Sequence, residues 1–139
     1  MFYLDTSVLV SAVSAEIGTP AVLEWFETAD DVLVSDWLMT EAVAALSQKL
    51  RMGVITATER AGSLAALRRH LEGAFRSLPV TREDFRAAAR FAERAETGLR
   101  GGGALHIALA SASNATLVTL DRKQARAGEM LGIQTLVLV

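Results

Sequence analysis

Three acidic residues stand where an ordinary surface carboxylate would not. Asp5 directly follows the apolar run "FYL", and Asp121 directly follows "TLVTL". Glu41 lies in "MTEAVAAL", where its neighbours are apolar or small, and a carboxylate in such surroundings needs a cationic partner. If the two runs are parallel strands, their carboxyl ends meet at the edge of the sheet where ligands bind. We therefore expect Asp5, Glu41 and Asp121 to converge.

Converging carboxylates predict a particular chemistry. They repel one another, and their pKa values rise unless a cation is bound among them. Oxygen ligands alone suit Mg²⁺ or Mn²⁺. A bound divalent cation lowers the pKa of a coordinated water and holds a phosphodiester for in-line attack. The three acids therefore indicate metal-dependent hydrolysis of a phosphodiester, with Thr6 or Thr119 placed to orient a ligand or the phosphate.

Ordinary structural roles compete with this interpretation. An aspartate after a strand is commonly a helix cap, which applies to Asp5, Asp36 and Asp121. Glu41 could be a charge at a helix edge that pairs with an arginine. His106 lies in the apolar stretch "ALHIALA" with no second histidine nearby, so we expect a satisfied or solvated side chain there rather than a ligand.

The segments that carry these acids predict an alternation of strands and helices. Apolar runs predict strands at 2–4, 32–34, 116–120 and 134–139, with a further short strand at 77–80. Helical spacing predicts helices at 6–15, 20–29, 37–52, 56–75, 82–96, 104–113 and 121–131. In the helix at 20–29, Val22, Leu23 and Phe26 are expected to face inward. Short, fully apolar strands between helices indicate a parallel sheet covered on both faces. The predicted fold is one three-layer α/β/α domain over residues 1–139.

Composition limits the function classes. The chain of 139 residues is 51% hydrophobic and has no cysteine, which removes disulfides and thiolate metal sites. No apolar run is long enough to span a membrane, and no secretory signal precedes the first strand, so we expect a cytoplasmic protein. The net charge of -2 does not favour a general affinity for nucleic acid. Binding to nucleic acid would need a local basic patch or a metal ion.

One basic feature could supply such a patch. Arg82, Arg86, Arg90 and Arg94 recur every four residues, which places them in one stripe on a helix. The stripe could follow a phosphate backbone and bind RNA. It could equally be a solvated face that is balanced by the glutamates near it.

Four stretches together resemble a PIN domain, and within that family a VapC toxin of bacterial toxin–antitoxin modules. In order they are "MFYLDTSVLVSAV", "VSDWLMTEAVAAL", "LRGGGALHIALA" and "LVTLDRKQARAGEMLGIQTL". The resemblance covers nearly the whole chain. It implies an endoribonuclease that uses Mg²⁺ or Mn²⁺ at Asp5, Glu41 and Asp121, forms a homodimer and is inhibited by a VapB-type antitoxin.

The third stretch departs from the family pattern. The family usually has an acid just before Ala-Leu-His, and here that position is Gly103. The missing acid would be a metal ligand and would also complement the helix dipole. An introduced inactivation, a natural loss of activity and a substitute acid are the three explanations, although residues 99–113 contain no acid. We therefore expect weaker metal binding and a sharp loss of activity.

Two further functions stay open at this stage. A catalytically inactive PIN module would keep its antitoxin or RNA partner and cut nothing, and Gly103 favours it. A phosphoacceptor domain also uses acids at strand ends, but "YLDTS" lacks the second acid that such a site needs, and Lys123 does not follow a strand directly. The metal-dependent endoribonuclease, impaired at Gly103, is the function that the sequence predicts.

Overall fold

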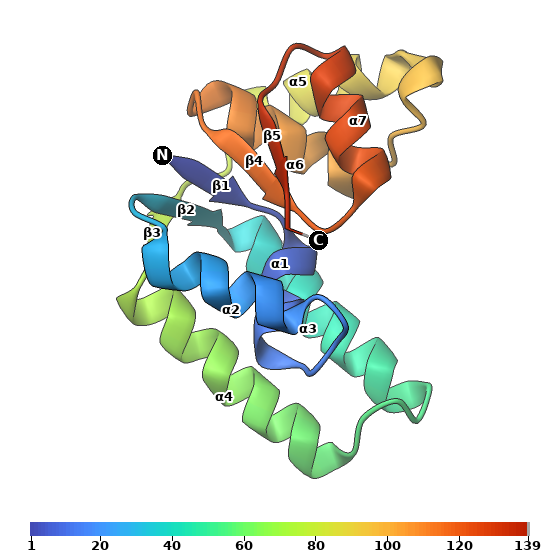
Figure 1. The fold of residues 1–139 in the computed structure, drawn as a ribbon. Coiled ribbons are helices and arrows are strands. Elements are labelled where there is room, and N and C mark those ends of the chain that lie inside the picture. The colour runs from blue at the N-terminus through green and yellow to red at the C-terminus, as the bar shows by residue number, and fades with distance from the viewer. Residues whose placement is uncertain (139) are drawn as a thin grey trace.

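The computed structural model describes residues 1–138, and at its centre is a sheet of five parallel strands (Figure 1). From edge to edge the strands are β3 (Arg76–Leu78), β2 (Val32–Ser35), β1 (Phe2–Leu4), β4 (Thr116–Thr119) and β5 (Thr135–Val137). Every neighbouring pair is parallel. The predicted parallel sheet is confirmed, and the short strand expected at 77–80 is β3.

The described residues also form seven α-helices and one short 3-10 helix. They are α1 (Thr6–Val13), α2 (Thr19–Thr28), α3 (Asp36–Arg51), α4 (Ala57–Gly73), α5 (Arg82–Glu93), η1 (Ala95–Thr97), α6 (Gly101–Ala112) and α7 (Arg122–Met130). Figure 1 shows α1 to α4 on one face of the sheet and α5 to α7 on the other. This arrangement confirms the three layers. Within residues 1–138, no helix has both the length and the apolar character needed to cross a membrane.

The central strands contribute side chains to two separate cores, because successive side chains point to opposite faces of a sheet. On β1, Leu4 packs with α1 to α4, while its neighbour Tyr3 packs with α5 and α6. On β4, Val118 and Leu117 divide in the same way. Leu4, Leu117 and Val118 have no exposed surface, and burying each such side chain contributes about 1.5–3 kcal/mol. These two cores hold the carboxyl ends of β1 and β4 side by side.

Two local predictions need correction. Leu23 does not face inward, because it is 45% exposed. The residues of α2 that pack toward the core are Val22, Trp25 and Phe26. They occupy positions i, i+3 and i+4 and so form a single stripe on the helix. Helix α6 begins at Gly101 rather than after the glycines. The three glycines are therefore its first turn, at the edge of the sheet where the acids were expected.

Candidate active site

Asp5 is a buried helix cap at the carboxyl end of β1. Its Oδ1 accepts hydrogen bonds from Ser7 N at 3.0 Å, Val8 N at 3.4 Å and Ser7 Oγ at 2.5 Å. Its Oδ2 accepts from Thr119 Oγ1 at 2.7 Å. Only 3% of Asp5 is exposed, and this burial raises its pKa above the usual range, although the nearby His106 and the hydrogen bonds act in the opposite direction. The charged form of Asp5 is therefore costly without a nearby cation.

Glu41 is held on one of its two oxygens. Its Oε2 accepts from Thr6 Oγ1 at 2.7 Å and from His106 Nε2 at 2.6 Å. Partial burial raises the pKa of Glu41, but the hydrogen bonds from His106 and Thr6 outweigh it, so the pKa lies below its ordinary value. Glu41 is thus kept ionised, and its partner is a histidine instead of the arginine that sequence reasoning considered.

The other oxygen of Glu41 explains one of the three glycines. A Cβ on Gly102 would stand 2.5 Å from Glu41 Oε1, closer than real Cβ contacts come. Because Oε2 is already bound by His106 and Thr6, the carboxylate cannot swing aside without losing those bonds. Gly102 therefore leaves the room in which Oε1 of Glu41 lies.

His106 connects Glu41 to the core. It is 2% exposed, and its Nδ1 lies 2.9 Å from the Tyr3 hydroxyl, which lies 2.8 Å from Ser35 Oγ. Ser35 in turn caps α3 by accepting from Leu38 N. The expectation of a satisfied histidine agrees with these bonds, but its contact with Glu41 was missed. The available signal was a polar residue in a helix that is apolar nearly all round.

Asp121 caps α7 and is joined to Asp5 through one hydroxyl. Its Oδ1 accepts from Lys123 N at 2.8 Å and Gln124 N at 3.2 Å. Thr119 Oγ1 donates to Asp5 Oδ2 and accepts from Asp121 N at 2.9 Å. Thr119 therefore fixes the spacing of the two acids at the end of β4.

A cleft of about 500 Å³ lies at this edge. Its lining residues are Glu41, Thr97, Gly98, Leu99, Arg100, Gly102, Gly103, Asp121, Lys123 and Gln124. Glu41 and Asp121 thus line one cleft, while Asp5 is linked to Asp121 alone, through Thr119. In the part of the chain that the structure describes, no three His, Asp or Glu side chains are close enough together to hold a metal ion.

The comparisons with known proteins identify the family of the chain and its fold. The family model of the PIN domain matches residues 2–130. The chain belongs to the PIN domain family. No curated protein matches it by sequence.

Solved structures share the PIN fold with this chain. VapC20 of Mycobacterium tuberculosis, described as a sarcin-ricin loop cleaving toxin, superposes with a TM-score of 0.77 at 16% identity, covering 92% of this chain and 95% of its own. PAE2754 of Pyrobaculum aerophilum has a TM-score of 0.71 at 22% identity, covering 96% of this chain and 82% of its own. VapBC2 of Rickettsia felis, bound to a DNA fragment from its promoter, has a TM-score of 0.70 at 17% identity, and the match covers 100% of both chains.

This PIN domain has no structural reason for glycine at position 103. Gly103 is not among the residues with positive φ. A Cβ there would make ordinary contacts of 3.6 Å with Gln124 Oε1 and Leu99 Cδ2. Because Gly103 lines the same cleft as Glu41 and Asp121, a carboxylate at 103 would complete a set of oxygen donors that suits Mg²⁺ or Mn²⁺. The cleft itself therefore offers a divalent cation two carboxylates, Glu41 and Asp121, and a third oxygen donor would have to come from position 103 or another residue of the lining.

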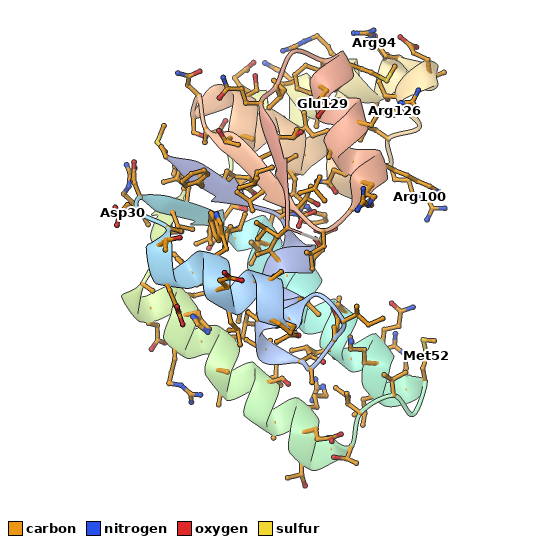
Figure 2. The ribbon with its side chains drawn as sticks, viewed as in Figure 1. Asp30, Met52, Arg94, Arg100, Arg126 and Glu129 are labelled. Atoms are coloured by element: carbon orange, nitrogen blue, oxygen red, sulfur yellow. The ribbon has the colours of Figure 1, made fainter. Side chains whose placement is uncertain are left out.

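The arginine stripe does not line the cleft. Arg82, Arg86 and Arg90 are exposed on α5, and Arg86 pairs with a glutamate three residues before it. Arg100 and Lys123 line the cleft instead, and Figure 2 shows Arg100 extending outward from the loop before α6. Sequence reasoning did not select these two cations, because neither belongs to a periodic pattern.

Proposed function

We propose that this PIN domain is an endoribonuclease toxin of the VapC type, dependent on Mg²⁺ or Mn²⁺ and neutralised by a VapB-type antitoxin. Family membership supports a nuclease, because PIN domains are generally nucleases. The likeness in fold to VapC20 and VapBC2 supports the toxin, its RNA substrate and its partner. The observation that carries the proposal is the shared cleft of Glu41 and Asp121, with Asp5 tied to Asp121 through Thr119.

The residues of the site have distinct roles in this proposal. Asp5, Glu41 and Asp121 would hold the metal, which supplies an activated water and polarises a phosphodiester. Thr6 orients Glu41, and Thr119 orients Asp5, through the hydrogen bonds already described. A guanidinium of the antitoxin would pair with these carboxylates in a bidentate manner and exclude the metal.

The assembly and location of the protein belong to the same proposal. We place the toxin in the cytoplasm, where its RNA substrate and its antitoxin would be available. It would form a homodimer, for which light scattering of the purified protein should give twice the mass of the chain. If light scattering gives the mass of a single chain at every protein concentration, the homodimer is ruled out, while the proposed nuclease site is unaffected.

Catalysis would be impaired because Gly103 adds no carboxylate to the cleft. A site with one ligand charge fewer binds a divalent cation less tightly.

The second candidate is a catalytically inactive PIN module that acts by binding antitoxin or RNA. It is favoured by one observation: among residues 1–138, no three His, Asp or Glu side chains are close enough together to hold a metal ion.

The test is a comparison of three proteins on RNA. The wild type, Gly103→Asp and Gly101→Asp are incubated with total RNA and Mn²⁺ or Mg²⁺, with and without a chelator. Gly101→Asp is the matched control, because it adds the same charge to the same helical turn, a Cβ there meets nothing within 4 Å, and Gly101 does not line the cleft.

Each outcome favours one function. Cleavage by Gly103→Asp alone, stopped by the chelator, supports the impaired nuclease. Cleavage by the wild type as well would mean that the site tolerates the missing acid. If no folded variant cuts RNA while binding to RNA or antitoxin persists, the binding module is the better description.

A further inference from the structure

Gln124 is placed against the position of the missing acid. It lies in the first turn of α7, three residues after Asp121, to which its backbone N–H donates. Its Oε1 lies 3.6 Å, and its Cδ 3.8 Å, from the point where a Cβ on Gly103 would be. The amide of Gln124 therefore occupies the part of the cleft into which a side chain at 103 would extend.

The amide of Gln124 also has an unusual environment. Its Nε2 is buried and has no hydrogen-bond partner among the described residues. Buried polar groups are nearly always paired, and a glutamine that only filled space could be replaced by an apolar side chain at no cost in hydrogen bonds. Gln124 is thus an amide that no hydrogen bond holds in place, and it lines the same cleft as Glu41 and Asp121.

We propose that Gln124 takes the place of the missing carboxylate, its amide oxygen serving as an oxygen donor to the divalent cation beside Glu41 and Asp121; this rests on the proposed function. Side-chain amide oxygens are accepted ligands of hard cations. Because no hydrogen bond fixes the buried Nε2, the amide is free to turn its oxygen toward a cation in the cleft. A neutral donor adds no charge, so the site binds metal, but weakly.

The proposal can be tested by the binding of Mn²⁺ alone, measured by calorimetry. Gln124→Met keeps the volume of the side chain and removes the amide, and Gln124→Glu puts a carboxylate at the same place. Gln134→Glu is the matched control, since Gln134 is an exposed glutamine just before β5, at the amino end of that strand and away from the cleft. Gly103→Asp is measured in parallel as the variant that restores the expected ligand. Thermal unfolding of each variant in chelator confirms that it is folded.

We expect Gln124→Glu to tighten Mn²⁺ binding on the order of tenfold, Gln124→Met to weaken it, and Gln134→Glu to leave it unchanged. Equal affinities of the wild type and Gln124→Met would overturn the proposal, as would equal affinities of Gln124→Glu and Gln134→Glu. If Gly103→Asp tightens binding in that case, the metal site stands and only the role of Gln124 is lost. If Gly103→Asp does not tighten binding either, the metal-dependent nuclease fails as well.

Discussion

His106 Nε2 lies 2.6 Å from Glu41 Oε2, so an imidazole on α6 holds a carboxylate on α3 that is 65 residues away in the sequence. A carboxylate only accepts hydrogen bonds, so the proton of this pair is on Nε2. On the other side of the ring, Nδ1 lies 2.9 Å from the Tyr3 hydroxyl, which lies 2.8 Å from Ser35 Oγ. Each group of this buried chain therefore has a hydrogen-bond partner.

The chain of hydrogen bonds predicts which nitrogen of His106 carries a proton, and how the stability of the protein changes when the Tyr3 hydroxyl is removed. Nitrogen-15 spectra should show a proton on Nε2 of His106, and an unprotonated Nε2 would contradict the arrangement. Tyr3→Phe should destabilise the protein by about 1–3 kcal/mol, because it leaves the buried Nδ1 of His106 unpaired. Urea denaturation measures this loss. A variant as stable as the wild type would show that the hydroxyl of Tyr3 adds nothing.

Gly101 and Gly102 offer a matched pair of substitutions on one helical turn. Gly101→Ala meets nothing within 4 Å and should stabilise the protein by about 0.4–1 kcal/mol. Gly102→Ala brings a Cβ 2.5 Å from Glu41 Oε1 and should cost roughly 1–3 kcal/mol, as overpacking does. Chemical denaturation of both variants in chelator tests the difference. Equal stabilities would mean that Glu41 moves freely and is not held by His106.

The fold could be predicted largely because its central strands, β1, β2 and β4, are short and mostly apolar. Such runs between helices leave few arrangements other than a parallel sheet with two helical layers. Leu23 was placed wrongly for a physical reason: an apolar residue in a surface helix faces inward only if it lies on the stripe that its neighbours define, and in α2 that stripe is Val22, Trp25 and Phe26.

The site could be predicted only in part. Asp5, Glu41 and Asp121 stood out because each is anomalous in its own local sequence. His106, Arg100 and Gln124 belong to the site through tertiary packing of α6 and α7, and no local pattern records that packing. The absent acid at Gly103 was found by comparison with a family pattern, while the glutamine beside it required coordinates.

Arg100 and Lys123 should contribute more to RNA binding than the arginine stripe does. Both line the cleft, so their replacement by alanine removes positive charge where the phosphate would lie. The logarithm of the RNA-binding constant falls linearly with the logarithm of the salt concentration. For each phosphate contact that is lost, the magnitude of this slope should decrease by about 0.7 on single-stranded RNA. Fluorescence anisotropy at several salt concentrations measures it, with Arg82→Ala and Arg90→Ala as the charge-matched control. A larger effect of the control pair would mean that RNA follows α5 instead.

Asp5 should lower the stability of the protein at neutral pH when no metal is bound. Burial raises the pKa of Asp5 above its ordinary value of 3.8, so the folded protein binds a proton there more tightly than the unfolded chain does. The stability of the protein therefore falls as the pH rises from the ordinary pKa of Asp5 through its raised pKa in the folded protein.

Asp5→Asn removes this charge and can keep the capping oxygen. In chelator at neutral pH the variant should unfold at a higher temperature than the wild type, by about 2–4 °C for each kcal/mol gained, and the gain should shrink as the pH is lowered. The exposed Asp36, in the first turn of α3, provides the control. Its replacement by asparagine removes a charge that favours the helix dipole and should slightly lower the unfolding temperature. If Asp5→Asn also lowers it, the hydrogen bonds from Ser7 and Thr119 fully compensate the buried charge, and the carboxylate is as much a structural cap as a metal ligand.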